Sequence, residues 1–339
     1  MKAVRFHRHG GPEVLVFEDV PEPQLAPGDV LVRVRACALN HRDLCSRRGQ
    51  DGHRIPLPHI PGSDVAGEVV ASMSTDVAIG RRVMLQPGIS CSRCAACLSG
   101  RDNQCPRYEV LGDMTYDGGY AEFVKVPVQN LVSIPDRIDF VSAAAFPLAF
   151  LTAWHMLMTR GGLKRGDDVL VSFAASDVGQ AAVQIAFLLG ARVFATAGSE
   201  GFDRASALGA YEVIDHDRQD IAQQIHRMTN QRGVDIVIAH VPEATWPAGV
   251  ESLARGGRLV TCATTGVTAS LDVRAMVARQ LSVIGSYVGT KGELMRLTRF
   301  FFAGQLTPVV DRTFPLAAAA DAQRYLEESK PFGKLVLEI

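Results

Sequence analysis

Four cysteines crowd into one short segment of this chain. Two residues separate Cys91, Cys94 and Cys97 from one another, and Cys105 follows after seven more. Such gaps let successive thiolates converge on one tetrahedral ion, while a longer loop supplies the fourth ligand. An iron–sulfur cluster is the rival metal site, because Cys105-Pro106 is like the end of a ferredoxin motif, but those motifs place the last cysteine three residues on. Four reduced cysteines without metal are the third interpretation. The spacing favours a closed zinc site that contributes folding energy rather than catalysis.

The composition excludes several classes of function. At 339 residues the chain has room for two domains of roughly 100–200 residues. With 35 Lys+Arg against 36 Asp+Glu, it has no electrostatic attraction to nucleic acid or to a membrane surface. No apolar run is expected to reach the roughly 18–20 residues of a membrane span, and residues 1–7 lack a signal-peptide core. We therefore expect a cytoplasmic protein with a small-molecule partner.

Short alternating segments dominate the first third of the chain. Residues 30–36 and 64–70 have the apolar and polar pattern of strands, and Gly28-Asp29, Pro61-Gly62 and Gly118-Gly119 are turn signals. This pattern predicts a partly open β-barrel with long loops.

From about residue 150 onward, strands alternate with helices. A helix is expected over 178–189, between strands at 168–173 and 192–197. Further strands are expected at 212–214, 235–239, 258–262 and 281–286. This alternation predicts an α/β fold with a doubly wound parallel sheet. After about residue 288 the chain becomes amphipathic-helical, and a last strand at 334–338 is expected to return to the first domain.

Local phrases along nearly the whole chain carry a family resemblance. They are Ala38-Leu39-Asn40-His41-Arg42-Asp43-Leu44, Ile60-Pro61-Gly62-Ser63-Asp64-Val65-Ala66-Gly67, Gly118-Gly119-Tyr120-Ala121-Glu122, Leu151-Thr152-Ala153-Trp154-His155 and Gly256-Gly257-Arg258-Leu259-Val260. Together with the cysteine segment they resemble the medium-chain dehydrogenase/reductase superfamily. The resemblance implies a GroES-like barrel domain over 1–148 and 288–339, with a zinc lobe at 88–110, and a Rossmann nucleotide-binding domain over 149–287.

The resemblance also bears on catalysis. The chain looks most like the quinone-reductase and acryloyl-CoA-reductase-like branch that keeps the structural zinc, which implies NADPH-dependent reduction of a quinone, a carbonyl or an activated double bond. Zinc alcohol dehydrogenases of the superfamily hold a second, catalytic zinc. Its ligand positions fall here on Asn40, Ser63 and near Leu148, none a usual zinc ligand. The resemblance therefore implies direct hydride transfer without a catalytic zinc.

The turn after the first central strand departs from the family pattern. Relatives read approximately Gly-Ala-(Gly/Ser)-(Ser/Gly)-Gly-Val-Gly, whereas residues 173–179 read Phe-Ala-Ala-Ser-Asp-Val-Gly. Phe173 adds bulk to a tight turn, and Asp177 places a carboxylate where the cofactor pyrophosphate would lie. Two like charges about 4 Å apart repel by about 4 kcal/mol at an effective dielectric constant near 20. The expected contacts in this turn are Ala174, Ser176, Asp177, Val178 and Gly179.

Three further loops are expected to touch the cofactor. Gly198 and Ser199 suit a 2′-phosphate, and Arg204 offers charge, although the lysine common among NADPH-using relatives is absent. The stretch His240-Val241-Pro242 has proline where relatives have glycine, and the loop containing Thr264 is one glycine short. NADP(H) is the expected cofactor, but two interpretations stay open. Either these loops have drifted and still bind NADPH, or the site has lost nicotinamide binding.

Six residues are candidates for chemistry in the expected substrate cleft. They are Asn40, His41, Asp43, Ser63, Asp64 and Tyr287. His41 is a possible proton donor or a solvated surface residue, and Asp43 is a catalytic group or a structural hydrogen-bonding one. Tyr287 can donate a hydrogen bond or simply pack.

Three functional hypotheses follow. The first is an NADPH-dependent reductase of quinones or activated enones and enoyl thioesters, active as a homodimer through edge strands of the nucleotide domain. The second is a redox-neutral cyclase, isomerase or lyase on the same scaffold. The third is a non-catalytic binding protein.

Overall fold

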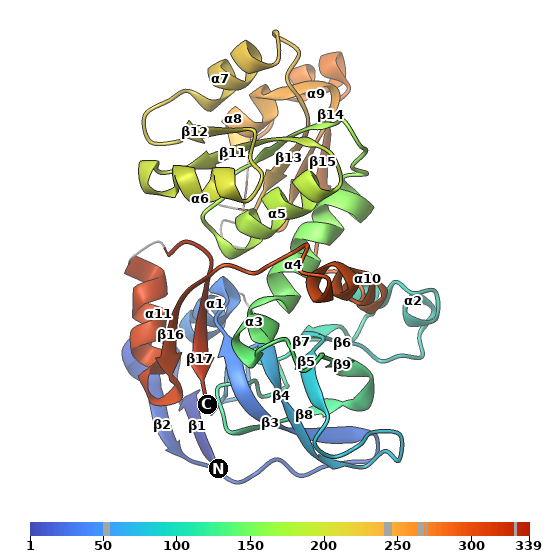
Figure 1. The fold of residues 1–339 in the computed structure, drawn as a ribbon, viewed down its shortest axis with the longest axis vertical. Coiled ribbons are helices and arrows are strands. Elements are labelled where there is room, and N and C mark those ends of the chain that lie inside the picture. The colour runs from blue at the N-terminus through green and yellow to red at the C-terminus, as the bar shows by residue number, and fades with distance from the viewer. Residues whose placement is uncertain (50–54, 241–245, 264–267, 269, 329–330) are drawn as a thin grey trace. The chain divides into compact units, whose positions relative to one another are not determined.

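The computed structural model describes residues 1–49, 55–240, 246–263, 268, 270–328 and 331–339. The chain divides into two compact units (Figure 1). Unit 1 comprises Met1–Leu148 and Thr290–Ile339, and unit 2 comprises Ala149–Gly289. The predicted α/β class is confirmed, with a barrel-like β unit and a parallel-sheet unit.

Unit 1 is built on a curved sheet in the order β16-β17-β3-β4-β5-β9, with β8 paired to β3. The strands of the unit are β1 (Lys2–Phe6), β2 (Leu15–Asp19), β3 (Asp29–Ala38), β4 (Asp64–Ser72), β5 (Arg82–Leu85), β6 (Gly88–Ile89), β7 (Glu109–Val110), β8 (Phe123–Pro127), β9 (Leu131–Ser133), β16 (Val310–Pro315) and β17 (Lys334–Glu338). β1 with β2, and β6 with β7, form separate two-stranded sheets. At the β3–β4 contact, a Cβ on Gly67 would lie 2.0 Å from the Arg33 carbonyl oxygen. Only glycine fits where the two backbones approach this closely.

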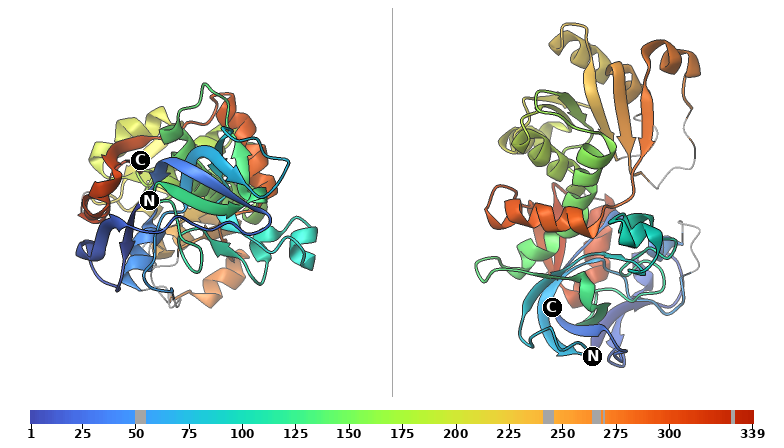
Figure 2. Two further views of the ribbon diagram at one scale, coloured as in Figure 1. Left: turned by 90° about the horizontal axis from the view of Figure 1, so that it is seen from below. Right: turned by 90° about the vertical axis from the view of Figure 1, so that its right-hand side faces the viewer.

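The carboxyl-terminal tail belongs to unit 1. Strand β17 pairs antiparallel with β3, and its neighbour β16 pairs parallel with β17. Both chain termini lie in this unit, close together in each view of Figure 2. The helices of the unit are α1 (His41–Arg48), α2 (Ala95–Leu98), α3 (Phe140–Ala145), α10 (Lys291–Phe302) and α11 (Ala319–Glu328). A capping box between Thr290 and Glu293 begins α10.

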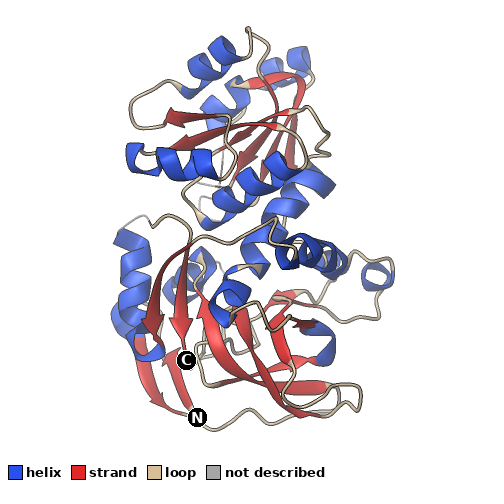
Figure 3. Ribbon diagram, viewed as in Figure 1, coloured by secondary structure: helices blue, strands red, loops and turns tan. Residues whose placement is uncertain are grey.

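Unit 2 is a parallel sheet in the order β12-β11-β10-β13-β14-β15, with helices on both faces (Figure 3). Its strands are β10 (Asp168–Val171), β11 (Arg192–Ala197), β12 (Glu212–Asp215), β13 (Val234–Ala239), β14 (Leu253–Thr261) and β15 (Ser282–Gly285). Its helices are α5 (Asp177–Leu188), α6 (Phe202–Ala207), α7 (Ile221–Met228), α8 (Trp246–Glu251) and α9 (Val273–Arg279). All four residues of β10 are buried, as expected for a central strand covered on both faces. The strand order reverses between β10 and β13, and ligands bind beyond the carboxyl ends of the strands at such a switch point.

One expectation about apolar runs was wrong. Phe140–Arg160 is a continuous 21-residue helical stretch through α3, α4 (Pro147–Trp154) and a π-helical segment (His155–Arg160), and it is long and apolar enough to cross a membrane. Buried side chains make up 83% of its most apolar window. The run of small and apolar residues therefore fits a core helix packed against other elements.

Candidate functional site

The four lobe cysteines converge on one point. Their Sγ atoms all lie within 4.8 Å of one another, with 3.9 Å between Cys91 and Cys97 and 3.5 Å between Cys94 and Cys97. Four thiolates at about 2.3 Å from a tetrahedral zinc ion would lie about 3.8 Å apart. The donor set and its dimensions therefore fit zinc.

Hydrogen bonds from backbone amides stabilise the thiolate form of the lobe cysteines. The N–H groups of Cys91 and Arg107 donate to Cys105 Sγ at 3.5 and 3.3 Å. A hydrogen bond from the Arg93 backbone lowers the pKa of the Cys91 thiol to about 5, and the Arg107 guanidinium acts in the same direction. Thiolates are the form that binds zinc, so the segment is organised for metal binding.

A second polar cluster is fully buried in unit 1. Lys334, the first residue of β17, places its Nζ 3.2 Å from Asp64 Oδ2 and donates to Asn40 Oδ1 at 2.5 Å and to the Leu39 carbonyl at 2.9 Å. Asn40 Nδ2 in turn donates to Asp64 Oδ2 at 3.0 Å, and the Leu148 N–H donates to Asp64 Oδ1 at 2.8 Å. The ammonium is therefore paired and hydrogen-bonded, as a buried charge must be.

Asp43 extends this cluster. Its Oδ2 accepts from the Asn40 N–H at 2.9 Å and from the Tyr120 hydroxyl at 3.2 Å, while its buried Oδ1 has no hydrogen-bond partner among the described residues. Burial raises the pKa of Asp43 to about 7, opposed by the Asn40 backbone bond and by Lys334. Burial also raises the pKa of Asp64, opposed chiefly by the Lys334 ammonium. Asp43 can therefore hold or release a proton near neutral pH.

The other candidates of unit 1 are placed differently. Ser63 is fully buried, and its hydroxyl has no hydrogen-bond partner within the described part of the chain. His41, the first residue of α1, is exposed. The structure thus joins Asn40, Asp43 and Asp64 in one network and leaves His41 outside it.

In unit 2 the turn between β10 and α5 is held by its own side chains. Phe173 adopts a left-handed backbone conformation with φ of +50°, which is strained for a bulky residue. Its N–H donates to Thr196 Oγ1 at 2.8 Å, and its ring stacks on His216 at a centroid distance of 4.2 Å. These contacts offset the strain and fill space beside the turn.

The first amides of α5 are also occupied. Ser176 is the N-cap residue, and its Oγ accepts from the Gly179 N–H at 2.9 Å. Asp177 Oδ1 accepts from the Val178 N–H at 2.8 Å. These amides are the groups with which a Rossmann helix binds pyrophosphate, and here a hydroxyl and a carboxylate take them. Gly179 keeps its packing role, because a Cβ there would lie 2.2 Å from the Phe173 carbonyl oxygen.

His240 closes the other side of the turn. Its Nε2 lies 2.5 Å from Ser176 Oγ, and its Nδ1 is buried without a hydrogen-bond partner among the described residues. Burial lowers the pKa of His240 to about 4, although the Asp177 carboxylate opposes this shift. His240 is therefore a neutral ring at pH 7, and it adds no positive charge for a phosphate.

A carboxylate lies at the end of β11. A Cβ built on Gly198 would find one described atom within 4 Å, Asp217 Oδ2 at 3.6 Å. Asp217 follows β12, whose last pair with β11 is Ala197 with Asp215. Ser199 and Arg204 are exposed nearby in sequence. The space beside Gly198 is thus open and bordered by a negative charge.

Comparisons with known proteins agree with this architecture. Residues 26–136 match the model of the alcohol dehydrogenase GroES-like domain, and residues 178–303 match that of zinc-binding dehydrogenases. The human quinone oxidoreductase is 30% identical over 99% of this chain and 97% of its own length. A crystal structure of an NAD-dependent alcohol dehydrogenase shares 43% identity and a TM-score of 0.96, covering all of both chains. A crotonyl-CoA carboxylase/reductase shares 26% identity and a TM-score of 0.93, covering all of this chain and 88% of its own.

This chain belongs to the medium-chain dehydrogenase/reductase superfamily of oxidoreductases.

The resemblance to zinc alcohol dehydrogenases assigns the catalytic zinc to positions at Asn40, Ser63 and near Leu148. In this medium-chain dehydrogenase/reductase these positions offer poor ligands. The Asn40 amide is used by Lys334 and Asp64, and Leu148 contributes a backbone N–H to Asp64. Of these three positions, only Ser63 has a buried polar side-chain atom without a partner among the described residues. The Lys334 ammonium beside Asn40, together with the side chains of Asn40 and Leu148, which are not usual zinc ligands, does not suit a zinc ion.

The predicted cofactor contacts are brought together only in part. Ala174, Ser176, Asp177, Val178 and Gly179 all lie in the β10–α5 turn, and Ser176 reaches His240. Gly198, Ser199 and Arg204 lie at and after the end of β11, and Thr264 is outside the described residues. Tyr287 follows β15 in unit 2 and is 39% exposed.

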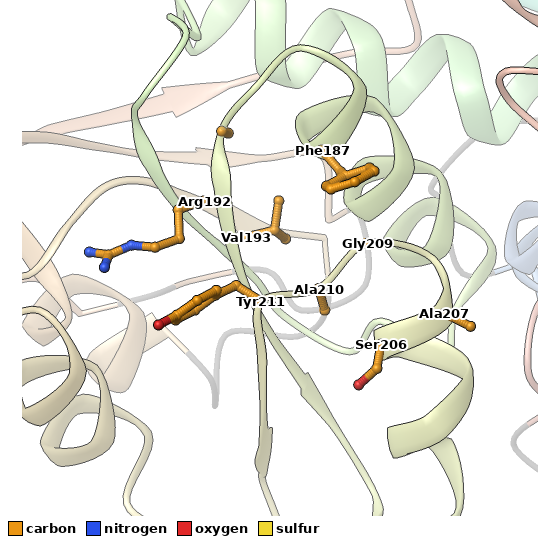
Figure 4. Close-up of a pocket in the computed structure, with 9 residues that line it drawn as sticks. Phe187, Arg192, Val193, Ser206, Ala207, Gly209, Ala210 and Tyr211 are labelled. Carbon is orange, nitrogen blue, oxygen red and sulfur yellow. The ribbon is translucent and has the colours of Figure 1, made fainter.

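A shallow pocket on unit 2 lies away from these residues. Its volume is about 480 Å³, and Figure 4 shows Phe187, Arg192, Ser206 and Tyr211 around it. Arg192 begins β11 and Tyr211 directly precedes β12, so the pocket is at the amino ends of these strands. Dinucleotides bind at the carboxyl ends. Asp168 also engages the Arg192 guanidinium through two 2.7 Å hydrogen bonds.

Sequence reasoning missed three residues of these sites: Lys334, His216 and Asp217. Lys334 is about 290 residues from Asn40 in sequence, and only the pairing of β17 with β3 joins them. His216 and Asp217 follow a short strand whose neighbours the sequence alone does not define. A usable signal was that both come directly after a predicted parallel strand, where ligand-contacting residues gather.

Proposed function

We propose that this chain is a reductase that takes hydride from a reduced nicotinamide dinucleotide and delivers it directly to a quinone or to an activated enone or enoyl thioester. Family membership supplies the reaction class. The human quinone oxidoreductase and the crotonyl-CoA carboxylase/reductase indicate the substrate classes by their names.

The observation that carries the proposal is the buried Lys334–Asp64–Asn40 network. It includes Asn40, one of the positions to which the resemblance assigns the catalytic metal of zinc alcohol dehydrogenases, and it puts an ammonium on Asn40 Oδ1. At a second such position, the Leu148 backbone N–H donates to Asp64. Without a Lewis acid, an unactivated alcohol is a poor substrate, whereas a quinone or conjugated carbonyl accepts hydride directly. When bound, the reduced nicotinamide supplies that hydride.

The residues of this chain then orient the substrate and supply protons. The Ser63 hydroxyl is a hydrogen-bond donor that no described residue uses, so it is suited to a substrate oxygen. Asp43, whose pKa lies at about 7, is suited to relay a proton through its buried carboxyl. Asn40 and Lys334 hold this cluster in place.

We propose that the cysteine lobe holds one structural zinc per chain through Cys91, Cys94, Cys97 and Cys105. Zinc there supplies folding energy and offers no open coordination position. Metal analysis of the purified protein is expected to give about one zinc per chain, and Cys94→Ser to lose it together with thermal stability. Iron with visible charge-transfer absorption would instead support a cluster.

A redox-neutral enzyme on the same scaffold is the second candidate. The Asp177 carboxylate on the Val178 N–H favours it, because it takes an amide that pyrophosphate needs and adds a negative charge. Such an enzyme would use Asp43 for acid–base chemistry and would need no nicotinamide.

Calorimetric titration with NADH and NADPH separates the two candidates. Binding near micromolar, followed by oxidation of the nicotinamide with a quinone or an enone, supports the reductase. No binding of either dinucleotide at millimolar concentration, to the wild type and to Asp177→Gly, contradicts it.

We further propose a cytoplasmic homodimer that pairs through β15, an edge strand of the unit 2 sheet. Edge strands carry unpaired N–H and C=O groups that a second copy can satisfy. Sedimentation of the intact protein tests this, and a monomer at micromolar concentration would rule it out.

A further inference from the structure

We infer that Asp217 makes this enzyme select NADH over NADPH. The inference rests on the proposed use of a nicotinamide dinucleotide, and it reverses the NADPH preference that the sequence of β11 and its following loop suggested.

Dinucleotide-binding sheets distinguish the two cofactors at the end of the second strand. There an acidic side chain accepts hydrogen bonds from the ribose hydroxyls of NAD, or a basic one meets the 2′-phosphate of NADP. In this chain the second strand is β11, which ends at Ala197, and the next residues Gly198 and Ser199 have no acid. Sequence inspection of this strand therefore points to NADP.

The fold supplies the acid from the neighbouring strand. β12 runs parallel to β11, and the backbone N–H of His216 reaches the Ala197 carbonyl at 3.4 Å. Asp217, the next residue, consequently lies beside Gly198, with Oδ2 at 3.6 Å from where a Cβ would stand. The absent side chain of Gly198 leaves the room that a ribose would need.

A local hydrogen bond fixes the backbone of the turn that carries this carboxylate. The Asp217 N–H donates to Asp215 Oδ1 at 3.0 Å, which sets the backbone of the turn. The Asp217 side chain is 67% exposed, and its Oδ1 lies 3.8 Å from His216 Nε2. It is thus positioned by the turn and still open to a ligand.

The charges nearby also favour a diol. Asp177 adds a second carboxylate at the turn, and His240 is neutral. The two basic side chains in this part of the sequence are Arg204, which is exposed on α6, and Arg218, whose Nε is 3.9 Å from Asp215 Oδ2. A 2′-phosphate would bring up to two more negative charges next to Asp217, whereas the ribose of NADH brings two hydrogen-bond donors.

Binding of NADH and NADPH to the intact protein tests this inference. We expect NADH to bind at least about tenfold more tightly than NADPH. The free energy of one charge-assisted hydrogen bond corresponds to a ratio of this size between the two Kd values. Asp217→Asn should bring the ratio close to one, since the amide keeps the size of the side chain and loses its charge. Asp136→Asn removes one exposed charge in unit 1 and should leave the ratio unchanged.

Adenosine 2′-monophosphate and adenosine are probes that lack the pyrophosphate, so Asp177 interferes with them less. Adenosine should bind better than its 2′-phosphate to the wild type, and Asp217→Asn should narrow the difference. Tighter binding of NADPH, or a ratio that Asp217→Asn does not change, would overturn the inference and leave the reductase proposal intact. No binding of either dinucleotide to the wild type and to Asp177→Gly would overturn both.

Discussion

At two positions where the family resemblance implies a bound ligand, a charged side chain of this chain makes a hydrogen bond instead, and the two positions differ in burial. In unit 1 the Lys334 ammonium donates to Asn40 in a fully buried network with Asp64. In unit 2 the Asp177 carboxylate accepts from the Val178 N–H at a partly exposed helix end. The buried Lys334 ammonium is balanced by the opposite charge of Asp64. The partly exposed Asp177 carboxylate instead competes with water and with phosphate for the Val178 N–H.

The difference in burial decides how easily each charged side chain could give way to a ligand. A buried ion pair cannot be opened without leaving a charge in a low-dielectric interior, so the unit 1 position is committed to its present network. A half-exposed aspartate can rotate away at small cost. We therefore expect ligand binding to be tunable in unit 2 and not in unit 1.

The largest expected effect comes from Lys334→Met. This change leaves Asp64 buried without its cationic partner, and removal of one member of such a pair costs about 3–5 kcal/mol. Chemical denaturation should show this loss of unfolding free energy. The double variant with Asp64→Asn should recover part of it, and a loss below about 1 kcal/mol would show that the network is not a tight ion pair.

The next effect is the pH dependence of stability through Asp43. Its folded pKa of about 7 lies above its ordinary value of 3.8, so its contribution to the free energy of unfolding is full below about pH 4 and is lost as the pH rises through 7. The loss is about 2–4 kcal/mol. Denaturation midpoints from pH 4 to 8 should fall less steeply in Asp43→Asn than in the wild type. An equal slope in both proteins would contradict the raised pKa.

A smaller effect is expected in the dinucleotide turn. Asp177→Gly frees the Val178 N–H and removes a negative charge, so NADH and NADPH should both bind about 10–100-fold more tightly. Asp177→Asn keeps an acceptor for the amide and separates charge from hydrogen bonding. If neither variant gains affinity in calorimetry, the Phe173–His216 stack becomes the obstacle to examine by Phe173→Gly.

The smallest effect is expected from Ser176→Ala. Loss of this N-cap should cost about 1 kcal/mol of unfolding free energy, because the Gly179 N–H loses its acceptor. Thermal unfolding measures it. Ser142→Ala is the control, because it removes a serine hydroxyl that donates to the Asp139 side chain at the start of α3 and leaves the N-cap bond from the Ser142 N–H to Asp139 in place. A cost equal in both variants would mean that Ser176 adds nothing beyond an ordinary surface serine.

The secondary-structure elements and the cysteine cluster could be predicted from the sequence alone. The alternation of strands and helices predicted the parallel sheet, and β11 was predicted at its observed bounds. The cysteine spacing predicted that the four thiols lie together, since all four residues lie within 15 positions and a short loop leaves few ways to arrange them. A local sequence pattern is enough to predict a feature whose interacting residues are close together in the sequence.

Which residues surround the candidate sites could be learned from the tertiary structure alone. Lys334 reaches Asn40 through strand pairing across nearly the whole chain, and Asp217 reaches Gly198 because β12 lies beside β11. The first amides of α5 donate to Ser176 and Asp177, and this too depends on side-chain orientation, which residue identity does not specify. Long-range pairing brings together residues that no sequence spacing connects, and that pairing sets which charges a ligand meets.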